Sequence, residues 1–125
     1  MNKPIAIIAG EPNSISSEII FKSWIQRKRY YHKSFIIIGS ISLLNMQKEK
    51  LKNNIKIKKI DFNFNIKNLK NNELPVYDVK YKQKAAFEKI SKKSNKYILN
   101  CFDIALKLIK NKKIIGIINC PVSKE

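Results

Sequence analysis

Hydrophobic residues in this chain occur either in short unbroken runs or at intervals of three and four positions. The runs predict strands, and they lie at residues 4–9, 34–38 and 114–118. Each run is apolar on both faces, as strands inside a parallel sheet are. Turn-forming residues close the first two runs at Gly10 and Gly39, so we expect both strands to end there.

Helical spacing of apolar residues predicts four helices. They cover residues 15 to about 29–32, 40 or 42 to 51, 83–91 and 94–110. Asn13 or Ser14 is a suitable N-cap for the first helix, because a short polar side chain can accept a bond from the first turn. Ser40 or Ser42 can cap the second helix in the same way.

The middle of the chain has a weaker pattern. Residues 55–66 alternate between apolar and polar side chains, which predicts one or two half-exposed strands near a sheet edge. Residues 68–72 are polar and predict a turn, and residues 74–77 predict a short strand. Pro75 lies inside that strand and favours an edge position, since proline cannot donate to a strand ladder.

Strands that alternate with helices predict an α/β fold with a mainly parallel sheet and helices on both faces. The 125 residues make one domain's worth of chain. After the last strand, the segment 119–125 reads as the start of a further helix. We therefore expect residues 1–125 to be a single incomplete domain that exposes apolar sheet edge or face.

The formal charge of +17 comes almost entirely from lysine, which provides 24 of the 26 basic residues. Two interpretations stay open: a solvated lysine-rich surface, and a non-enzymatic module that binds polyanions or nucleic acid. Arginine makes the bidentate contacts that phosphates and bases favour, and its scarcity argues against a specific nucleic-acid partner.

Several features point to a cytoplasmic setting without a membrane partner. No run reaches the roughly 18 consecutive apolar residues of a membrane span, and the N-terminus lacks the pattern of a secretory signal. The two cysteines, Cys101 and Cys120, form no disulfide framework. With the single His32 they would also make too few ligands for a tetrahedral metal shell.

The first candidate site is the loop between the first strand and the first helix. Loops at the carboxyl edge of parallel strands bind phosphates and nucleotides, because a helix N-terminus presents free N–H groups there. The expected ligand-facing residues are Gly10, Glu11, Pro12, Asn13 and Ser14. The loop is neither a Walker loop nor GxGxxG, and an ordinary capped turn is the alternative interpretation.

The second candidate segment follows the last strand, at residues 119–125. It should face the same edge of the sheet as the first loop, with Pro121 and Lys124 lining it. Lys124 could neutralise an anionic ligand, but in a chain with 24 lysines one more surface lysine is the simpler interpretation. A different α/β enzyme, with Glu11 and Lys124 at an anion site, is a further hypothesis.

These two segments carry a resemblance to a known family. Residues 4–12 (PIAIIAGEP) and then 18–20 (EII) resemble the opening of the 4-hydroxythreonine-4-phosphate dehydrogenase (PdxA) family, which is a strand, a G-[DE]-P-A-G-I-G-P-E loop and a helix. Residues 117–125 (IINCPVSKE) resemble that family's strand and T-x-P-[IV]-x-K segment. The helix over 94–108 is similar to the family helix that leads into this strand.

The resemblance implies an NAD-dependent oxidation of 4-phosphooxy-L-threonine, a small phosphorylated amino acid, on the route to pyridoxal phosphate. It also implies a divalent metal ion, such as zinc, magnesium or cobalt, held by histidines in a homodimer. The implied fold is two-lobed and isopropylmalate-dehydrogenase-like, and this chain would form part of one lobe.

The chain departs from the family at two places. Residues 13–17 (NSISS) replace A-G-I-G-P, so that serine stands at both glycine positions, which matters if the turn needs a positive φ. The metal-binding histidines of the family lie beyond the P-V-x-K segment, and His32 matches none of them and is expected on the surface. We therefore expect an N-terminal fragment with no catalytic or metal-binding residue of its own, inactive alone.

Overall fold

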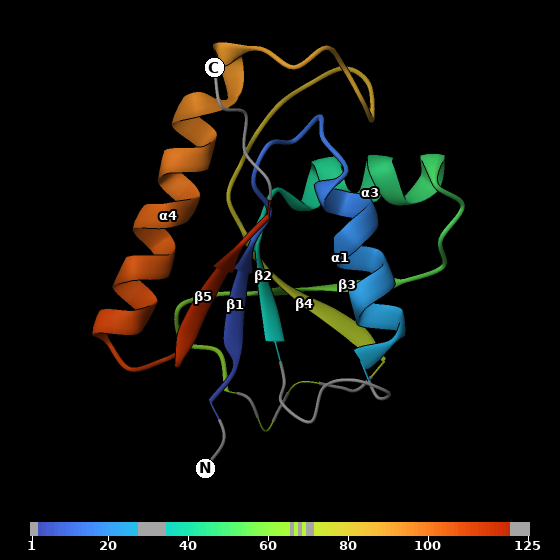
Figure 1. The fold of residues 1–125 in the computed structure, drawn as a ribbon. Helices are drawn as coiled ribbons and strands as arrows, with labels where there is room; N and C mark the ends of the chain where they lie inside the picture. Colours follow the sequence, from blue (N-terminus) through green and yellow to red (C-terminus); the bar gives the residue numbers. More distant parts are fainter. Residues whose placement is uncertain (1–2, 28–34, 66, 68, 70–71, 121–125) are drawn as a thin grey trace.

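Five parallel strands form the centre of the computed structural model, which describes residues 3–27, 35–65, 67, 69 and 72–120 (Figure 1). The strands are β1 (Ile5–Ile8), β2 (Phe35–Gly39), β3 (Lys56–Ile60), β4 (Glu73–Asp78) and β5 (Gly116–Asn119). Their order in the sheet is β3-β4-β2-β1-β5, and all four pairings are parallel. The predicted α/β fold with a parallel sheet is confirmed.

Helices cover both faces of the sheet, as predicted. The helices are α1 (Ser16–Ile25), α3 (Ile41–Lys50) and α4 (Asn95–Lys110), with the 3₁₀ turn η2 (Lys92–Ser94) before the last. Helix α4 lies on one side of the sheet, and α1 and α3 lie on the other (Figure 1). Alternate side chains of the central strands point to opposite faces of the sheet, so that Ile36 packs with α4 and Ile37 packs with α1.

Strand β1 is apolar on both faces because it lies between two strands and two layers of helix. Its Ile7 lies beside Ile37 of β2 and Ile118 of β5. Ala6 and Ile8 are fully buried beneath α4. On α4 itself the buried residues recur every three or four positions, at Tyr97, Cys101, Ala105 and Leu108. The predicted helix over 94–110 is therefore confirmed, with Ser94 at its N-cap position.

The two predicted helix starts near the sheet edge have different outcomes. Ser40 is the N-cap of α3, and its hydroxyl accepts a bond from the Leu43 N–H, as expected. The N-cap of α1 is Ile15, so neither Asn13 nor Ser14 holds that position. Ser14 still contributes from one residue further out, because its hydroxyl accepts a bond from the Ser16 N–H. Helix α1 ends at Ile25, and the predicted end at 29–32 lies outside the described residues.

The prediction of a helix over residues 83–91 is wrong, and this segment consists of bends and irregular backbone. Its large apolar side chains, Phe87 and Ile90, are 36% and 48% exposed, so a helix here would have little to bury. The backbone N–H groups of Lys84 and Ala85 bond instead to the carboxylate of Glu88.

The prediction that residues 74–77 form an edge strand is only half right. The strand exists as β4, but it lies between β2 and β3. Pro75 is tolerated there because the register with β2 begins only at Val76, one residue after the proline. The missing N–H therefore does not interrupt the ladder to β2.

The alternating segment 55–66 forms one strand, β3, which lies at a sheet edge as predicted. After β3 the chain turns, and Phe62 and Phe64 pack against the core on the α4 side instead of forming a second strand. Most of the predicted turn at 68–72 lies outside the described residues, and Asn72 is in a turn.

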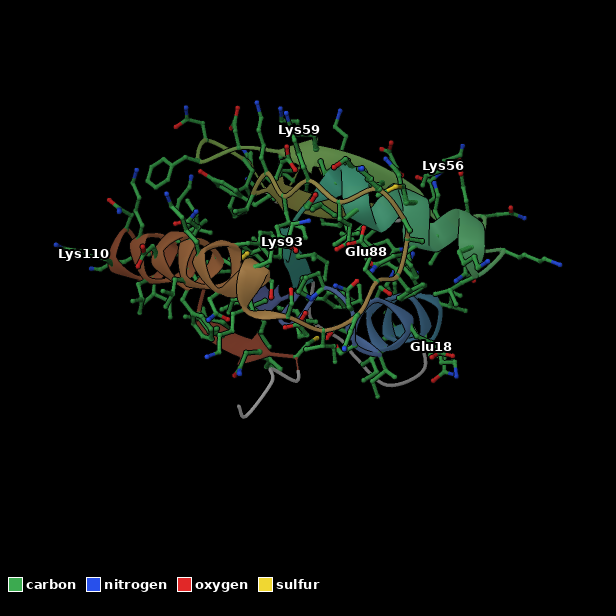
Figure 2. The ribbon with its side chains drawn as sticks, turned by 90° about the horizontal axis from the view of Figure 1, so that it is seen from above. Glu18, Lys56, Lys59, Glu88, Lys93 and Lys110 are labelled. Carbon is green, nitrogen blue, oxygen red and sulfur yellow. The ribbon has the colours of Figure 1, made fainter. Side chains whose placement is uncertain are left out.

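The two edges of the sheet differ in chemistry. Edge strand β3 exposes Lys56, Lys58 and Lys59, and Figure 2 shows Lys56 and Lys59 along its outer side. Such lysines discourage pairing with another chain. The other edge strand, β5, has no charged residue, and Ile118 on it is 51% exposed, with Ile115 just before it 52% exposed. No helix among the described residues is both long enough and apolar enough to span a membrane.

Candidate functional site at the carboxyl edge of the sheet

The loops after four of the strands begin side by side at one edge of the sheet. The N–H of Ala9 bonds to the Ile38 carbonyl oxygen at 3.0 Å, and the N–H of Cys120 bonds to the Ile8 oxygen at 3.0 Å. On the β4 side, the N–H of Val79 bonds to the Gly39 oxygen at 2.8 Å. These bonds extend the parallel ladder past the strand ends, so the first candidate loop and the start of the last segment face the same edge, as expected.

Gly10 turns the chain out of β1 into the first candidate loop. Its φ of 67° lies in the left-handed region, which glycine adopts without the penalty of a Cβ. Ser14 and Ser16, at the two family glycine positions, do not have a positive φ. The serines are therefore compatible with this turn.

Glu11 is buried to 99% of its surface and links two distant parts of the chain. One carboxylate oxygen accepts the backbone N–H of Asn13 at 3.3 Å. The other accepts the hydroxyl of Ser94, at the start of α4, at 3.0 Å. Both donors are neutral groups, so the carboxylate is held by hydrogen bonds at the junction of the β1–α1 loop and α4.

Asn13 connects the same loop to the segment between β4 and α4. Its side-chain oxygen accepts bonds from Gln83 Nε2 and from the Glu88 N–H, both at 2.8 Å. Its side-chain nitrogen donates to Gln83 Oε1 at 3.3 Å. The two amides are thus paired in both directions, and the segment is fastened to the rim of the candidate site.

Gln47 is a third connection, and sequence reasoning missed it. It is 2% exposed, and its Nε2 donates to the carbonyl oxygens of Pro12 at 2.7 Å and Ala86 at 2.9 Å. Gln47 follows the buried pair Leu43 and Leu44 at helical spacing, so a polar residue on the buried face of α3 was the available signal.

Tyr81 and Tyr97 lie next to each other near the candidate site, with ring centroids 4.8 Å apart. Burial raises the pKa of Tyr97 well above its usual value, and its hydroxyl accepts the Ser40 N–H at 2.9 Å. Burial also raises the pKa of Tyr81, with further contributions from the charges of Glu11 and Glu88. Both phenols therefore stay protonated near neutral pH and are unsuited to act as bases.

A small cavity lies beneath the loop, at the start of α1. The space open to the centre of a water molecule is about 10 Å³, so the cavity has room for about one water molecule. It is lined by Ala9, Glu11, Pro12, Ser16, Ser17, Leu43, Leu44, Gln47 and Tyr97. The hydroxyl of Ser17 is buried and has no hydrogen-bond partner among the described residues.

This geometry does not fit the groups that the resemblance implies. Within the ranges that the structure describes, no three His, Cys, Asp or Glu side chains are grouped so that they could hold a metal ion. The cavity is far smaller than a dinucleotide. Burial raises the pKa of Cys120 to about 11 and that of Cys101 to about 12, so both thiols stay protonated.

The structure thus brings five of the predicted site residues together. Gly10, Glu11 and Pro12 are buried in the loop, and Asn13 and Ser14 are half-buried on its rim. The other two predicted residues, Pro121 and Lys124, lie outside the described residues. Buried Cys120, bonded to Ile8, brings the chain to the same edge just before them.

Taken together, the strands, helices and loops define an α/β protein with a parallel sheet, a class in which ligands commonly bind at the carboxyl edge of the sheet. The family model described as "Pyridoxal phosphate biosynthetic protein PdxA" matches residues 31–125. The chain belongs to this family, as the resemblance of its two terminal segments indicated.

Individual relatives agree with the family match. The chain is 25% identical over 122 residues to the 4-hydroxythreonine-4-phosphate dehydrogenase of Zymomonas mobilis, covering 98% of this chain and 35% of the relative. A Salmonella typhimurium structure assigned to the same enzyme has a TM-score of 0.83 at 22% identity, covering 100% of this chain and 39% of that one. The chain therefore spans little more than a third of the length of these relatives.

The same fold also occurs with another substrate. A terephthalate 1,2-cis-dihydrodioldehydrogenase structure from Burkholderia xenovorans has a TM-score of 0.72 at 17% identity, covering 99% of this chain and 35% of that one. Likeness at this level of identity shows the fold, and a fold alone does not determine the substrate.

Proposed function

We propose that this chain forms the N-terminal part of an NAD-dependent dehydrogenase that oxidises 4-phosphooxy-L-threonine in pyridoxal phosphate biosynthesis. The observation that carries the proposal is the family match over residues 31–125. The loop cluster supports it, because the carboxyl edge of a parallel sheet is where α/β dehydrogenases bind their ligands. The chain spans about a third of its relatives, so it would supply only part of the catalytic unit.

In this proposal, the described residues build one wall of the site. Glu11 and Gln47 hold the β1–α1 loop in place, and Gly10 turns it toward the sheet edge. The N-terminus of α1 carries partial positive charge, which favours an anionic ligand nearby. Lys124 would lie on the facing segment and counter the negative charge of a phosphorylated amino acid.

The proposal assigns NAD and a divalent metal ion to the complete enzyme, because the described residues fit neither group. Zinc, magnesium and cobalt are the candidate metals. The complete enzyme would be a cytoplasmic homodimer, with residues 1–125 as one part of a larger domain. The described residues would then orient the substrate and exclude water, and they would not act as acid or base.

A chimera tests this proposal. Residues 1–125 replace the corresponding first third of the Zymomonas mobilis relative, and NADH formation is measured with 4-phosphooxy-L-threonine and a divalent metal ion. A folded chimera that forms NADH only with this substrate is the expected result. A chimera that melts cooperatively and yet forms no NADH would contradict the proposal.

A second test does not depend on how well the two parts fit. If the chain is the front part of such an enzyme, we expect the nucleotides after codon 125 to encode a Gly-His-Thr-Glu-like stretch shortly downstream, in frame or after a frameshift. A downstream sequence without it would count against the proposal. In the NADH assay of the chimera, residues 1–125 alone are the negative control, and we expect no turnover from them.

Polyanion binding is the alternative function that the charge suggests. The three exposed lysines of β3 are accounted for by protection of a sheet edge, without a nucleic-acid partner. A salt titration of binding to duplex and single-stranded DNA separates the two cases. Affinity that persists at moderate salt with a sequence preference would favour the alternative, since non-specific binding is lost as salt rises.

A further inference from the structure

A segment without regular secondary structure crosses the carboxyl edge of the sheet between β4 and η2. We call residues 79–91 the strap. It leaves the sheet at Val79, runs along α3 and the start of α1, and reaches α4 through η2 (Figures 1 and 2). The strap therefore lies over the β1–α1 loop, which contains the first candidate site.

The strap is fastened to this loop mainly through one side chain. Asn13 accepts bonds from Gln83 and from the Glu88 N–H, and it donates to Gln83 Oε1. Gln47 adds a bond to the Ala86 oxygen. Gln83 and Glu88 are five residues apart, so a single asparagine holds both sides of the strap's bend.

Apolar packing contributes little to the middle of the strap. Tyr81 packs against Tyr97 at one end, with the two rings tilted by 34°, but Phe87 and Ile90 are 36% and 48% exposed. A segment with few buried apolar contacts has a low free energy of local opening. The hydrogen bonds of Asn13 are therefore a large share of what keeps the strap closed.

Charge also favours opening. The strap carries four exposed lysines, at positions 80, 82, 84 and 89. Its one acid is Glu88, whose carboxylate bonds back to the N–H groups of Lys84 and Ala85 within the strap. Repulsion among the lysines opposes a compact arrangement, and salt weakens this repulsion.

We propose that the side chain of Asn13 holds this strap closed over the β1–α1 loop, and we call its three hydrogen bonds to Gln83 and Glu88 the latch. The strap opens as a unit when the latch bonds break, while the sheet and α4 stay folded, and opening uncovers Glu11, Ser94 and the cavity beside Ser17. In the family's loop motif the position of Asn13 is alanine, which cannot form these bonds, so the latch distinguishes this chain from that pattern. The inference concerns the folded chain alone and does not rest on the proposed function.

Amide hydrogen exchange of the whole chain tests the latch. Asn13→Ala should speed exchange of the hydrogen-bonded amides of the strap, those of Lys84, Ala85 and Glu88, by at least about tenfold, because it removes three hydrogen bonds. Exchange in β1, β2 and α4 should stay unchanged. Asn13→Asp keeps the oxygen that accepts from Gln83 and Glu88 but places a second acceptor opposite Gln83 Oε1, so it should restore only part of the protection. Asn100→Ala, at an exposed position on α4, is the matched control.

Two results would overturn the proposal: unchanged exchange over 83–91 in Asn13→Ala, or faster exchange that is equal in the strap and the sheet. If Asn13→Ala does not fold, Gln83→Ala breaks the same pairing from the strap side and leaves the β1–α1 loop intact. Cleavage by a lysine-specific protease is an independent measurement. The latch predicts faster cleavage after Lys84 and Lys89 in Gln83→Ala, and equal rates would contradict it.

Discussion

The hydroxyl of Ser94 donates a hydrogen bond of 3.0 Å to the buried carboxylate of Glu11. The bond joins the first loop of the chain to the start of its last long helix, 83 residues later. Ser94 is at the N-cap position of α4 but makes no capping bond with its side chain. Its hydroxyl is therefore available to Glu11, and the pair fixes one end of the candidate site.

Loss of this bond should destabilise the protein measurably. Ser94→Ala leaves a buried carboxylate with one donor fewer, and we expect a loss of about 1.5–3 kcal/mol in the free energy of unfolding. Urea denaturation measures it. Glu18→Ala is the control, because the Glu18–Lys22 pair is 3.7 Å long on an exposed surface and contributes at most about 1 kcal/mol. Equal losses of unfolding free energy in the two variants would show that the buried bond stabilises the protein no more than an exposed ion pair does.

Gly39 is required by close packing at the end of β2. A Cβ at this position would lie 2.8 Å from the Ala9 Cβ and 3.1 Å from the Tyr97 hydroxyl. Gly39→Ala should therefore cost about 1–3 kcal/mol through overpacking. Gly116→Ala is the matched control, since its Cβ would meet no atom within 4 Å, and it should be neutral or stabilise by up to about 1 kcal/mol. Thermal melts of both variants decide, and equal melting temperatures would contradict the prediction.

Gln47 should stabilise the protein because its side chain joins α3 to the β1–α1 loop and to the strap. Gln47→Leu fills a similar volume but leaves the Pro12 and Ala86 carbonyl oxygens without their donor. We expect a loss of about 1–3 kcal/mol, because buried acceptors lose a partner. Glu49→Gln, on the exposed side of α3, serves as the control in the same denaturation experiment. A Gln47→Leu protein as stable as this control would exclude the bridging role.

The strap should loosen at acid pH through Glu88. The N–H of Ala85 has the largest effect on the pKa of the Glu88 carboxyl and lowers it below its usual value. Burial opposes this shift, and the Lys84 N–H and the charges of Lys93 and Lys84 add smaller lowering contributions. Because folding lowers this pKa, the stabilisation by the Glu88 carboxylate is fully present above the pKa of the unfolded chain. It is lost as the pH falls through the pKa of the folded protein. Amide signals of residues 84 and 85 should titrate in that window.

In Glu88→Gln this titration should disappear, because no carboxylate remains to protonate. Glu49→Gln should leave it unchanged, since Glu49 belongs to α3 and not to the strap. Persistence of the same titration in Glu88→Gln would mean that another group controls the strap.

The uncharged edge at β5 should make the isolated chain bind a hydrophobic dye or self-associate. Ile115 and Ile118 are each about half exposed there, and exposed apolar strand edges recruit other chains. Ile118→Lys should reduce dye fluorescence and association, and Lys59→Gln on β3 should not reduce them. Sedimentation and dye titration measure both. A tight monomer without dye binding would contradict the prediction that the β5 edge recruits other chains.

Much of the fold could be predicted from the sequence because local pattern determined it. The apolar runs in β1 and β2 and the helical spacing in α4 each reflect a single environment along the whole element. Ser40, one of the two predicted N-caps of α3, was also confirmed, whereas the same local reasoning misplaced the N-cap of α1, which is Ile15. The two segments that resemble the PdxA family indicated the family that the comparison then showed.

The candidate site was predictable only in part. Its loop, from Gly10 to Ser14, was located because it follows an apolar run and contains turn formers. Its contacts to Gln47, Gln83 and Ser94 were not predictable, since these residues are 35 or more positions away in the chain. No local pattern records which distant side chain will reach a loop.

The sequence by itself determined the parallel α/β layering, since buried strands and amphipathic helices follow from the alternation of apolar and polar residues. Only the tertiary structure decided that Pro75 lies in an inner strand, that residues 83–91 form a strap instead of a helix, and that Asn13 fastens it. Each of these depends on which neighbours supply hydrogen bonds and buried surface, and those neighbours are set by the packing of the whole chain.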